Sequence, residues 1–464
     1  MTSAIYLLSY AALPLFGMLL AAHRVTGIDS RAARIGFAFL AGALLLTIEA
    51  TIFSIAGIRW NVIGLSLPLV AASLTVLLWP RIPSSPPQLA GRRTLVATHV
   101  ANAIVLISVL HFALSIITTQ SVSPDYVLFW GVKAVRFAAA AALDPGFLLS
   151  RFPPPHVDYP PLVPVVQAWG LLFSRRMPWI TAAGMSTVWL VAPIPFIRWS
   201  LERAFGRDFA AAVSAFWAAA MAASFAYSGC GGNADATLVA YISVAGVAII
   251  AERYDPRSRW IAAAAFAGAA LTKAEALAFI GAMLFGIAVR DLLRRDASVV
   301  RRVALLTLST AASISIWFGY QYRFGLPVGY HRFTNFQGLL LRNLPVILTE
   351  APKGLSAGCW GMSWLIPAAV LICVAVRSPR RLIDALPLLI SLPLLFAFFA
   401  FLYLQYTSGL AMQMSWTLPR VSQPLLSLLI LGTAFASGPL QENTGRGEPR
   451  PGTVGAGSLS PPPA

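Results

Sequence analysis

Long apolar runs recur along the whole sequence and restrict what it can fold into. Many of them approach the roughly 20 residues that a membrane-spanning helix needs. Hydrophobic residues make up 58% of the chain and charged residues only 11%, whereas a soluble domain has about 25% charged residues. Since a helix satisfies its own backbone groups in lipid, the sequence predicts an all-α polytopic membrane protein.

Basic residues fall in small groups between these apolar runs. The formal net charge of +17 is therefore explained by membrane topology, and we expect no nucleic-acid partner. Loops rich in Lys and Arg stay in the cytoplasm, which places the N-terminus outside. The groups assigned to the cytoplasm lie at 24–34, 81–93, 198–207, 253–259, 290–295 and 377–381.

The apolar runs predict thirteen membrane segments. Two short ones, 260–271 and 274–289, form a broken hairpin whose tip faces outward because both far ends are basic. The run 161–173 is too short to span, and we expect an interfacial or re-entrant helix there. The other segments cover about 4–22, 35–57, 62–79, 95–118, 180–197, 209–227, 235–251, 303–319, 360–376, 384–404 and 421–437.

The first outer loop concentrates charge between apolar segments, in Asp125–Leu162. Asp125 directly follows a membrane segment, where a carboxylate can accept a proton from an attacking hydroxyl. Ser123-Pro124-Asp125 also suits a helix N-cap, so both interpretations stay open. Lys133, in the same loop, is a further candidate for binding a substrate.

The end of this loop, His156–Leu162, offers a second candidate. His156 and Asp158 face one way in an extended segment, beside Tyr159, and can form a polar wall for a sugar or phosphate. The two prolines that follow allow a helix to start. A structural turn that anchors this helix is the alternative.

Charged residues also sit at the outer ends of later membrane segments. Asp235 begins one, with a helix cap as the alternative role. Lys273 and Glu275 lie at the break of the hairpin, where ionisable groups are costly unless they are paired or used. Lys273 can neutralise a phosphate or pair with Glu275. Arg420, before the last segment, is a second phosphate candidate or an ordinary interfacial arginine.

Several other chemistries lack a signature. There is no phosphate-binding loop of the GxxxxGK[ST] type, no dinucleotide fingerprint and no HExxH, so we expect an activated donor that is not a cytosolic nucleotide. The first apolar run has no basic residues before it and is followed by Arg24 rather than by a clear cleavage site, so we expect no cleavable signal peptide. Cys230 and Cys359 both map to the outer face, and a disulfide between them stays open.

Four motifs occur in an order that resembles a known family. They are Asp125 early in the first outer loop, the box Tyr159-Pro160-Pro161-Leu162, the pair Ala234-Asp235, and the break Thr272-Lys273-Ala274-Glu275. Over roughly residues 95–290 this set resembles the membrane glycosyltransferases of the GT-C fold. Within them it is most similar to the bacterial branch related to protein O-mannosyltransferases and to lipid A aminoarabinose transferases.

The resemblance implies an enzyme that uses a polyprenyl-phosphate sugar donor. Transfer would be inverting, to a glycan, lipid or protein acceptor on the periplasmic face of a bacterial inner membrane. Asp125 would be the base, and Lys273 and Arg420 would hold the donor phosphate. His156, Asp158, Tyr159, Asp235 and Glu275, with Lys133, would bind substrate.

The sequence departs from this family at two places. Relatives often carry Asp-Glu where this chain has Asp125-Tyr126, so we expect neither a cofactor nor a metal ligand set, with a divalent cation left open. Three extra helices also come before the helix that leads to the Asp125 loop, whereas relatives commonly start with one, and the helices of 1–94 have no assigned role. The resemblance marks 95–290, with outer loop 119–179, as the catalytic module. We expect 291–437, with outer loop 320–358, to form a C-terminal module, and 438–464, which is rich in Gly, Pro and Ser, to be a disordered cytoplasmic tail.

Two rival functions keep the same compartment. A transporter or flippase of lipid-linked saccharides also uses broken helices and membrane charge, although we find no internal repeat. A glycan polymerase or ligase would take a lipid diphosphate donor instead. Flux without sugar transfer distinguishes the first rival, and donor competition distinguishes the second.

Overall fold

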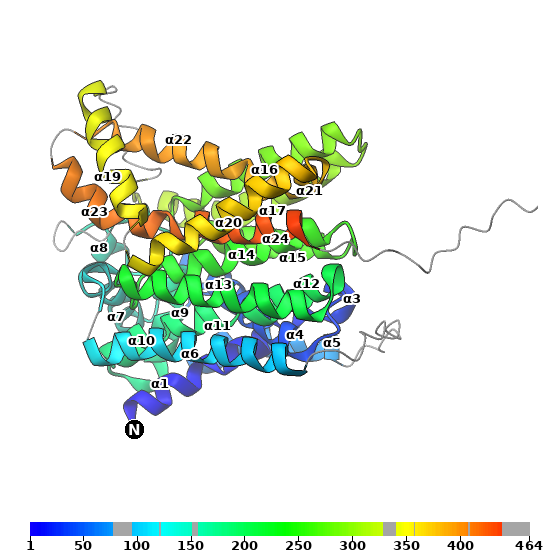
Figure 1. The fold of residues 1–464 in the computed structure, drawn as a ribbon. Coiled ribbons are helices and arrows are strands. Elements are labelled where there is room, and N and C mark those ends of the chain that lie inside the picture. Colours follow the sequence, from blue (N-terminus) through cyan, green and yellow to red (C-terminus); the bar gives the residue numbers. More distant parts are fainter. Residues whose placement is uncertain are drawn as a thin grey trace, which may run out of the picture.

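The computed structural model describes residues 1–77, 95–119, 122–150, 156–327, 340–356, 358–406 and 409–438. Over these ranges the secondary structure is helical, apart from one isolated parallel β-bridge between Val122 and Gly231. Figure 1 shows the helices running side by side as a bundle. The expected disordered tail, 438–464, lies outside the described residues except for Gly438.

Two glycines hold the N-terminal helices close together. A Cβ atom added to Gly17 would lie 1.8 Å from the carbonyl oxygen of Ala38, and one added to Gly42 would lie 1.9 Å from that of Leu13. Small residues of this kind let membrane helices approach backbone to backbone. The helices of this part are α1 (Thr2–Tyr10), α2 (Ala12–Ala21), α3 (His23–Thr26), α4 (Arg31–Ile55), α5 (Val62–Leu77) and α6 (Leu95–Thr119).

The segment that we expected to form the first outer loop contains short helices, and three longer segments follow it. The loop holds the π-helical turn η1 (Tyr126–Trp130), α7 (Gly131–Ala140), α8 (Pro145–Leu148) and α9 (Leu162–Ser174). The chain then forms α10 (Trp179–Gly184), α11 (Ser186–Val191), α12 (Ile194–Phe205), α13 (Arg207–Tyr227) and α14 (Asp235–Ala251).

The expected broken hairpin is present. It consists of α15 (Ser258–Ala270) and α16 (Ala276–Leu293), with the break at Lys273 as predicted. The second arm, at 18 residues, is longer than expected. The remaining elements are α17 (Val299–Arg323), η2 (Leu341–Asn343), α19 (Leu344–Ser356), α20 (Gly358–Arg377), α21 (Arg380–Leu389), α22 (Ser391–Tyr403), α23 (Leu410–Val421) and α24 (Gln423–Ser437).

The helices confirm a polytopic membrane protein. Within the described ranges, nine spans are long and apolar enough to cross a membrane, and four apolar helices are shorter. Every expected segment overlaps helical residues, but 4–22, 180–197 and 384–404 are each divided into two or three successive helices. The segment 62–79 is described only as far as residue 77. The spans are Thr2–Ala21, Arg31–Ile55, Val96–Thr118, Trp179–Phe205, Arg207–Tyr227, Ala276–Leu293, Val299–Arg323, Arg380–Tyr403 and Leu410–Ser437.

The helix α9, which we expected to be interfacial or re-entrant, is enclosed by other helices of the protein. All of its residues from Leu162 to Leu171 are buried, and it packs against α1, α4 and α7. The indole of Trp169 donates to the carbonyl of Ser9 at 2.9 Å. Because Gln167 is the one polar side chain between Leu162 and Leu171, enclosure by protein suits this part of the helix better than a surface, where one side would meet water.

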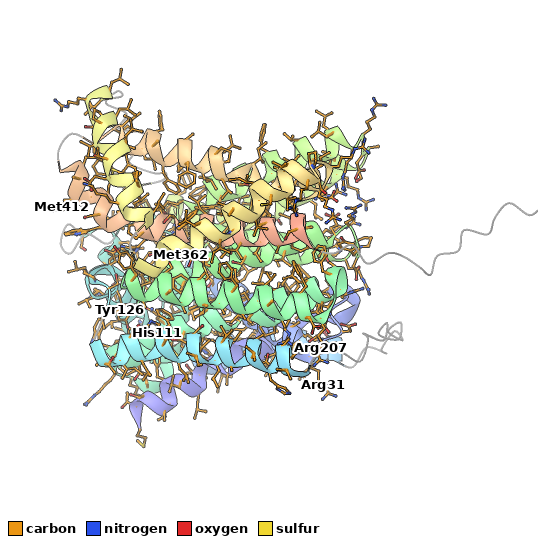
Figure 2. The ribbon with its side chains drawn as sticks, in the orientation of Figure 1. Arg31, His111, Tyr126, Arg207, Met362 and Met412 are labelled. Carbon is orange, nitrogen blue, oxygen red and sulfur yellow. The ribbon has the colours of Figure 1, made fainter. Side chains whose placement is uncertain are left out.

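The two ends of the bundle differ in charge. Figure 2 places Arg31 and Arg207 at one end, and Tyr126 and Met412 at the other. At the basic end, buried Asp291 accepts from Arg290 at 2.7 Å and pairs with Arg302, and Arg302 also reaches Glu252 at 2.9 Å. These contacts join α14, α16 and α17. The proposed division of the chain into modules stays a prediction.

Candidate active site

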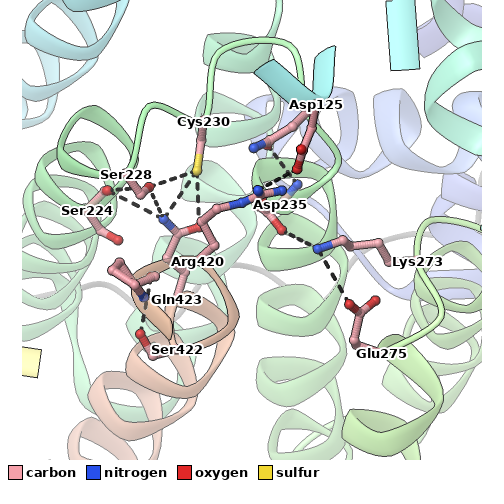
Figure 3. Close-up of polar contacts among 12 residues, drawn as sticks. Asp125, Ser224, Ser228, Cys230, Asp235, Lys273, Glu275, Arg420, Ser422 and Gln423 are labelled. Carbon is pink, nitrogen blue, oxygen red and sulfur yellow. Dashed lines mark hydrogen bonds and ion pairs between the residues drawn. The ribbon is translucent and has the colours of Figure 1, made fainter. Parts of the chain in front are cut away.

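A network of charged side chains lies at the end of the bundle opposite to that basic cluster. Its centre is Asp235, which is only 2% exposed. One oxygen, Oδ1, accepts from Lys273 Nζ at 2.7 Å, and the other, Oδ2, accepts from Arg420 Nε at 2.7 Å. One carboxylate therefore holds two cations that come from distant parts of the chain (Figure 3).

Two further acids face the same cations. Asp125 pairs with Arg420 through Nη1, and Glu275 Oε1 lies 3.9 Å from Lys273 Nζ. The side chains of Asp125 and Glu275 are 32% and 19% exposed, so they are more open than Asp235. The network thus combines three carboxylates with two cations and carries a formal charge of −1.

Neither Asp125 nor Asp235 caps a helix through its side chain, which was the alternative role for both. Asp125 precedes η1 without a side-chain capping bond. At the start of α14, the cap-like bond comes from Asn233, whose Oδ1 accepts from the backbone N–H of Asp235 at 3.1 Å. Both carboxylates are therefore left for the ion pairs, and Asp235 also lies where a helix N-terminus favours negative charge.

The proline box and the hairpin break meet through their backbones. The N–H of Leu162 donates to the carbonyl of Leu271 at 3.0 Å. An unsatisfied donor at the start of α9 thereby satisfies an acceptor at the end of α15. Tyr159, in the same box, contacts two residues of the network. Its hydroxyl donates to Glu275 at 3.3 Å, and Lys273 Nζ lies 6.0 Å from its ring centre.

The turn before Asp235 is held by buried polar side chains. Gly232 has φ of +85°, and an added Cβ would lie 2.4 Å from the ring of Tyr126. Its N–H donates to Ser186 Oγ at 2.8 Å, and its carbonyl accepts from Gln167 Nε2 at 3.2 Å. The N–H of Ser123 donates to the neighbouring Gly231 carbonyl at 3.1 Å, which ties the Asp125 loop to the Asp235 turn.

Arg420 is positioned by its own helix junction. It lies in the last turn of α23, and three residues later Gln423, which is fully buried, donates to Ser228 Oγ at 2.6 Å. The same amide contacts the sulfur of Cys230 at 3.4 Å. These bonds fix the start of α24 against the α13–α14 turn and thereby hold Arg420 next to Asp235.

The other predicted residues form an aromatic side of the same region. Phe129 stacks on Tyr159 with ring centres 6.1 Å apart and lies 4.8 Å from the ring of His156. His156 is exposed, and Asp158 is partly exposed. This surface is next to the charged network because Tyr159 belongs to both.

Lys133 is buried behind this surface and bonds to its backbone. It is 1% exposed, its Nζ donates to the carbonyl of His156 at 2.8 Å, and it lies 5.5 Å from the ring centre of Trp130. Burial lowers the pKa of Lys133 to about 7, and the charge of Asp158 partly opposes this shift. Its contact with the backbone, together with this burial, points to a role in holding the His156 turn.

The structure thus brings Asp125, Asp235, Lys273, Glu275 and Arg420 into one network, with Tyr159 at its edge. It leaves Lys133, His156 and Asp158 beside that network. Sequence reasoning missed the supporting residues Ser186, Gln167, Asn233 and Gln423. Polar side chains in or beside apolar helices were the available signal, but they gave no indication of their partners.

Two open expectations concern metals and cysteines. Among the described residues, no three His, Cys, Asp or Glu side chains cluster closely enough to share a metal ion. Cys230 is a buried free thiol. The side chain of Cys359, its suggested disulfide partner, lies outside the described residues.

Comparisons with known proteins give a distant likeness. No family model matches the sequence, and no curated protein matches it. One similar solved structure is the crystal structure of ArnT from Cupriavidus metallidurans bound to undecaprenyl phosphate, with 20% sequence identity and a TM-score of 0.49. The alignment covers 74% of this chain and 60% of that of ArnT.

The fold and the site together define a class of protein. It is a polytopic helical membrane protein with a paired acid–base network at one end of its bundle. Since the likeness to ArnT is distant, a more specific function has to be argued from the residues of this chain.

Proposed function

We propose that the chain is a membrane glycosyltransferase that moves a sugar from a polyprenyl-phosphate donor to an acceptor at the outer face of a bacterial inner membrane. One observation carries this proposal. Asp125, Asp235, Lys273 and Arg420, from four segments of the chain, meet in one ion-paired network. Asp125, Asp235 and Lys273 belong to the motifs on which the family resemblance rests, and Arg420 joins them from the C-terminal part of the chain.

The proposed chemistry assigns one task to each side of the network. The acceptor hydroxyl loses its proton to Asp125 as its oxygen attacks the anomeric carbon of the sugar. The bond from that carbon to the phosphate oxygen breaks, and the polyprenyl phosphate leaves with an additional negative charge. Lys273 and Arg420 offset this charge, since preorganised cations act most strongly where charge develops. Attack opposite to the leaving group inverts the sugar.

The remaining residues have supporting roles in this proposal. Asp235, with both oxygens occupied by cations, orients Lys273 and Arg420. The surface of Phe129, His156 and Tyr159 lies on the acceptor side, where aromatic rings suit the apolar faces of a sugar. Glycans, lipids and proteins all remain acceptor classes.

The alternative function, a transporter, fits this network less well. Transporter sites lie near the bilayer midplane, whereas this network joins helix ends at the start of α14 and the break after α15. A polymerase or ligase that uses a lipid diphosphate would share the same network. Competition between monophosphate and diphosphate lipids separates that function from the proposed one.

The proposal is tested by replacing the base. Asp125→Asn keeps the shape of the side chain and removes its ability to take a proton. Because a general base contributes about 10²- to 10⁴-fold, we expect sugar transfer by the purified protein to fall by at least about 100-fold. Asp144→Asn, in the same outer loop, is the control and should retain transfer. Full activity of Asp125→Asn would reject Asp125 as the base.

A further inference from the structure

The acids of the network form two layers around the cations. The inner layer is Asp235, which is buried and bonded through both oxygens at 2.7 Å. The outer layer is Asp125 and Glu275, which are more exposed and contact the cations from the other side. In this arrangement each cation already has an acid on its outer side.

An incoming phosphate therefore meets cations that are already paired. Arg420 uses Nε for Asp235 and Nη1 for Asp125, so a phosphate that binds the outer side of the guanidinium competes with Asp125. Lys273 presents a similar arrangement with Glu275 at 3.9 Å. With two cations and three carboxylates, adding an anion without moving an acid would place four negative groups around two positive ones.

The outer acids, Asp125 and Glu275, can separate from their cations more easily than Asp235 can. Separating Asp235 from its cations would leave a buried carboxylate without a partner, which is strongly unfavourable. Separating the more exposed pair of Arg420 and Asp125 costs much less, because water solvates the Asp125 carboxylate. Because Asp235 is 2% exposed and Asp125 is 32% exposed, the pair of Arg420 and Asp125 is the one that separates more easily.

We propose that the donor phosphate replaces Asp125 as the outer partner of Arg420, and that this exchange frees Asp125 to act as the base. While Asp125 is paired, its carboxylate is held against the guanidinium of Arg420 and is not free to turn toward an acceptor hydroxyl. Loading the donor thus releases the base, and the site without donor keeps it held against Arg420. This inference rests on the proposed function, since it assigns an order of events within the same site.

The exchange makes an unusual prediction for binding. A residue that helps to bind a ligand weakens binding when it is removed, whereas a competitor strengthens it. Asp125→Asn should therefore bind a polyprenyl monophosphate more tightly than the wild type, by about two- to fivefold, which corresponds to the loss of one partly exposed ion pair. Glu275→Gln should act in the same direction with a smaller effect, because its contact with Lys273 is longer.

The experiment measures equilibrium binding of undecaprenyl phosphate to the full chain in detergent, with uncharged undecaprenol as the comparison ligand. Asp125→Asn and Asp125→Ser provide two ways to remove the competing charge, and the thermal unfolding midpoint of each verifies folding. Asp144→Asn, whose partner Arg136 lies outside the network, is the matched control with unchanged affinity. Arg420→Met should weaken binding of the phosphate and leave binding of the alcohol unchanged.

The outcomes separate the two proposals. If folded Asp125→Asn and Asp125→Ser bind the phosphate equally well or more weakly, the exchange is overturned, whether or not the protein transfers sugar. If the wild type and Arg420→Met do not distinguish the phosphate from the alcohol, the donor site itself is wrong and the proposed function fails with it. Tighter binding together with lost transfer supports both.

Discussion

At the scale of single residues, Asp235 determines the geometry of the charged network. It accepts from Lys273 and Arg420 at equal distances of 2.7 Å, so one buried carboxylate orients two cations that lie 147 positions apart in the sequence (420 minus 273). Without this acid, buried Lys273 and half-buried Arg420 would repel each other and remain largely desolvated. The same residue is therefore required for the stability of the fold and for the arrangement of the site.

We predict that Asp235→Asn lowers the free energy of unfolding by about 3–5 kcal/mol, since it leaves buried Lys273 and half-buried Arg420 without their shared partner. Chemical denaturation of the purified protein, followed by tryptophan fluorescence, measures this loss. Asp144→Asn is the matched control, because Arg136 is 54% exposed and an exposed pair contributes within about 1 kcal/mol. Equal stability of the two variants would contradict the anchoring role of Asp235.

At the scale of elements, the site depends on how turns and helix ends are joined. The Asp125 loop and the turn before α14 share the β-bridge at Val122 and Gly231. The start of α9 and the end of α15 share the bond from Leu162 to Leu271. Each junction satisfies backbone groups that the separate elements leave unpaired, so the elements that carry Asp125, Tyr159, Asp235 and Lys273 are linked in pairs.

We predict that Gly232→Ala disturbs the site through the first of these junctions. The new Cβ would meet the ring of Tyr126 at 2.4 Å and displace the residue that follows Asp125. An error of about 1 Å in a reacting group costs roughly 100-fold in rate, so kcat for sugar transfer should fall by about 10- to 100-fold.

Gly229→Ala is the control for the backbone itself. Gly229 also has positive φ, at +61°, but nothing lies within 4 Å of its Cβ position. Both variants carry the strain of a left-handed residue, about 1–2 kcal/mol, and only Gly232→Ala adds the clash. Equal kcat values for the two variants would mean that contact with Tyr126 does not position Asp125.

At the scale of the whole molecule, the bundle separates two charged ends. One end carries the network of Asp125, Asp235 and Arg420. The other carries the ion pairs of Arg290, Asp291 and Arg302. Figure 1 shows α7, α8, α19 and α23 at the first end, away from α3. The positive-inside rule assigns the second end to the cytoplasm, so we expect the site to face outward.

This orientation predicts a pattern of labelling. Ala297→Cys, between α16 and α17, and Thr349→Cys, in α19, are both exposed positions. In a Cys359→Ser, Cys373→Ser background that keeps buried Cys230, a membrane-impermeant maleimide should label Thr349→Cys from outside. It should label Ala297→Cys only after the membrane is opened. The reverse pattern would place the site in the cytoplasm.

The sequence by itself determined the helices and the residues that carry charge. Apolar length is a local property, so the runs at 35–57 and 209–227 predicted α4 and α13 closely. An ionisable side chain beside an apolar run is costly wherever it lies, so Asp125, Asp235, Lys273, Glu275 and Arg420 could be selected from the sequence without knowledge of their neighbours.

Only the tertiary structure decided how these residues pair. From the sequence, Lys273 and Glu275 could simply have paired with each other, but Lys273 bonds to Asp235 at 2.7 Å, while Glu275 lies at 3.9 Å. The burial of α9 depends likewise on α1, α4 and α7 closing around it. Pairing and enclosure arise from contacts between distant segments, and no periodicity within one segment contains that information. The charged candidate residues could therefore be recognised from the sequence. Packing determined which acid anchors the cations and which remains accessible.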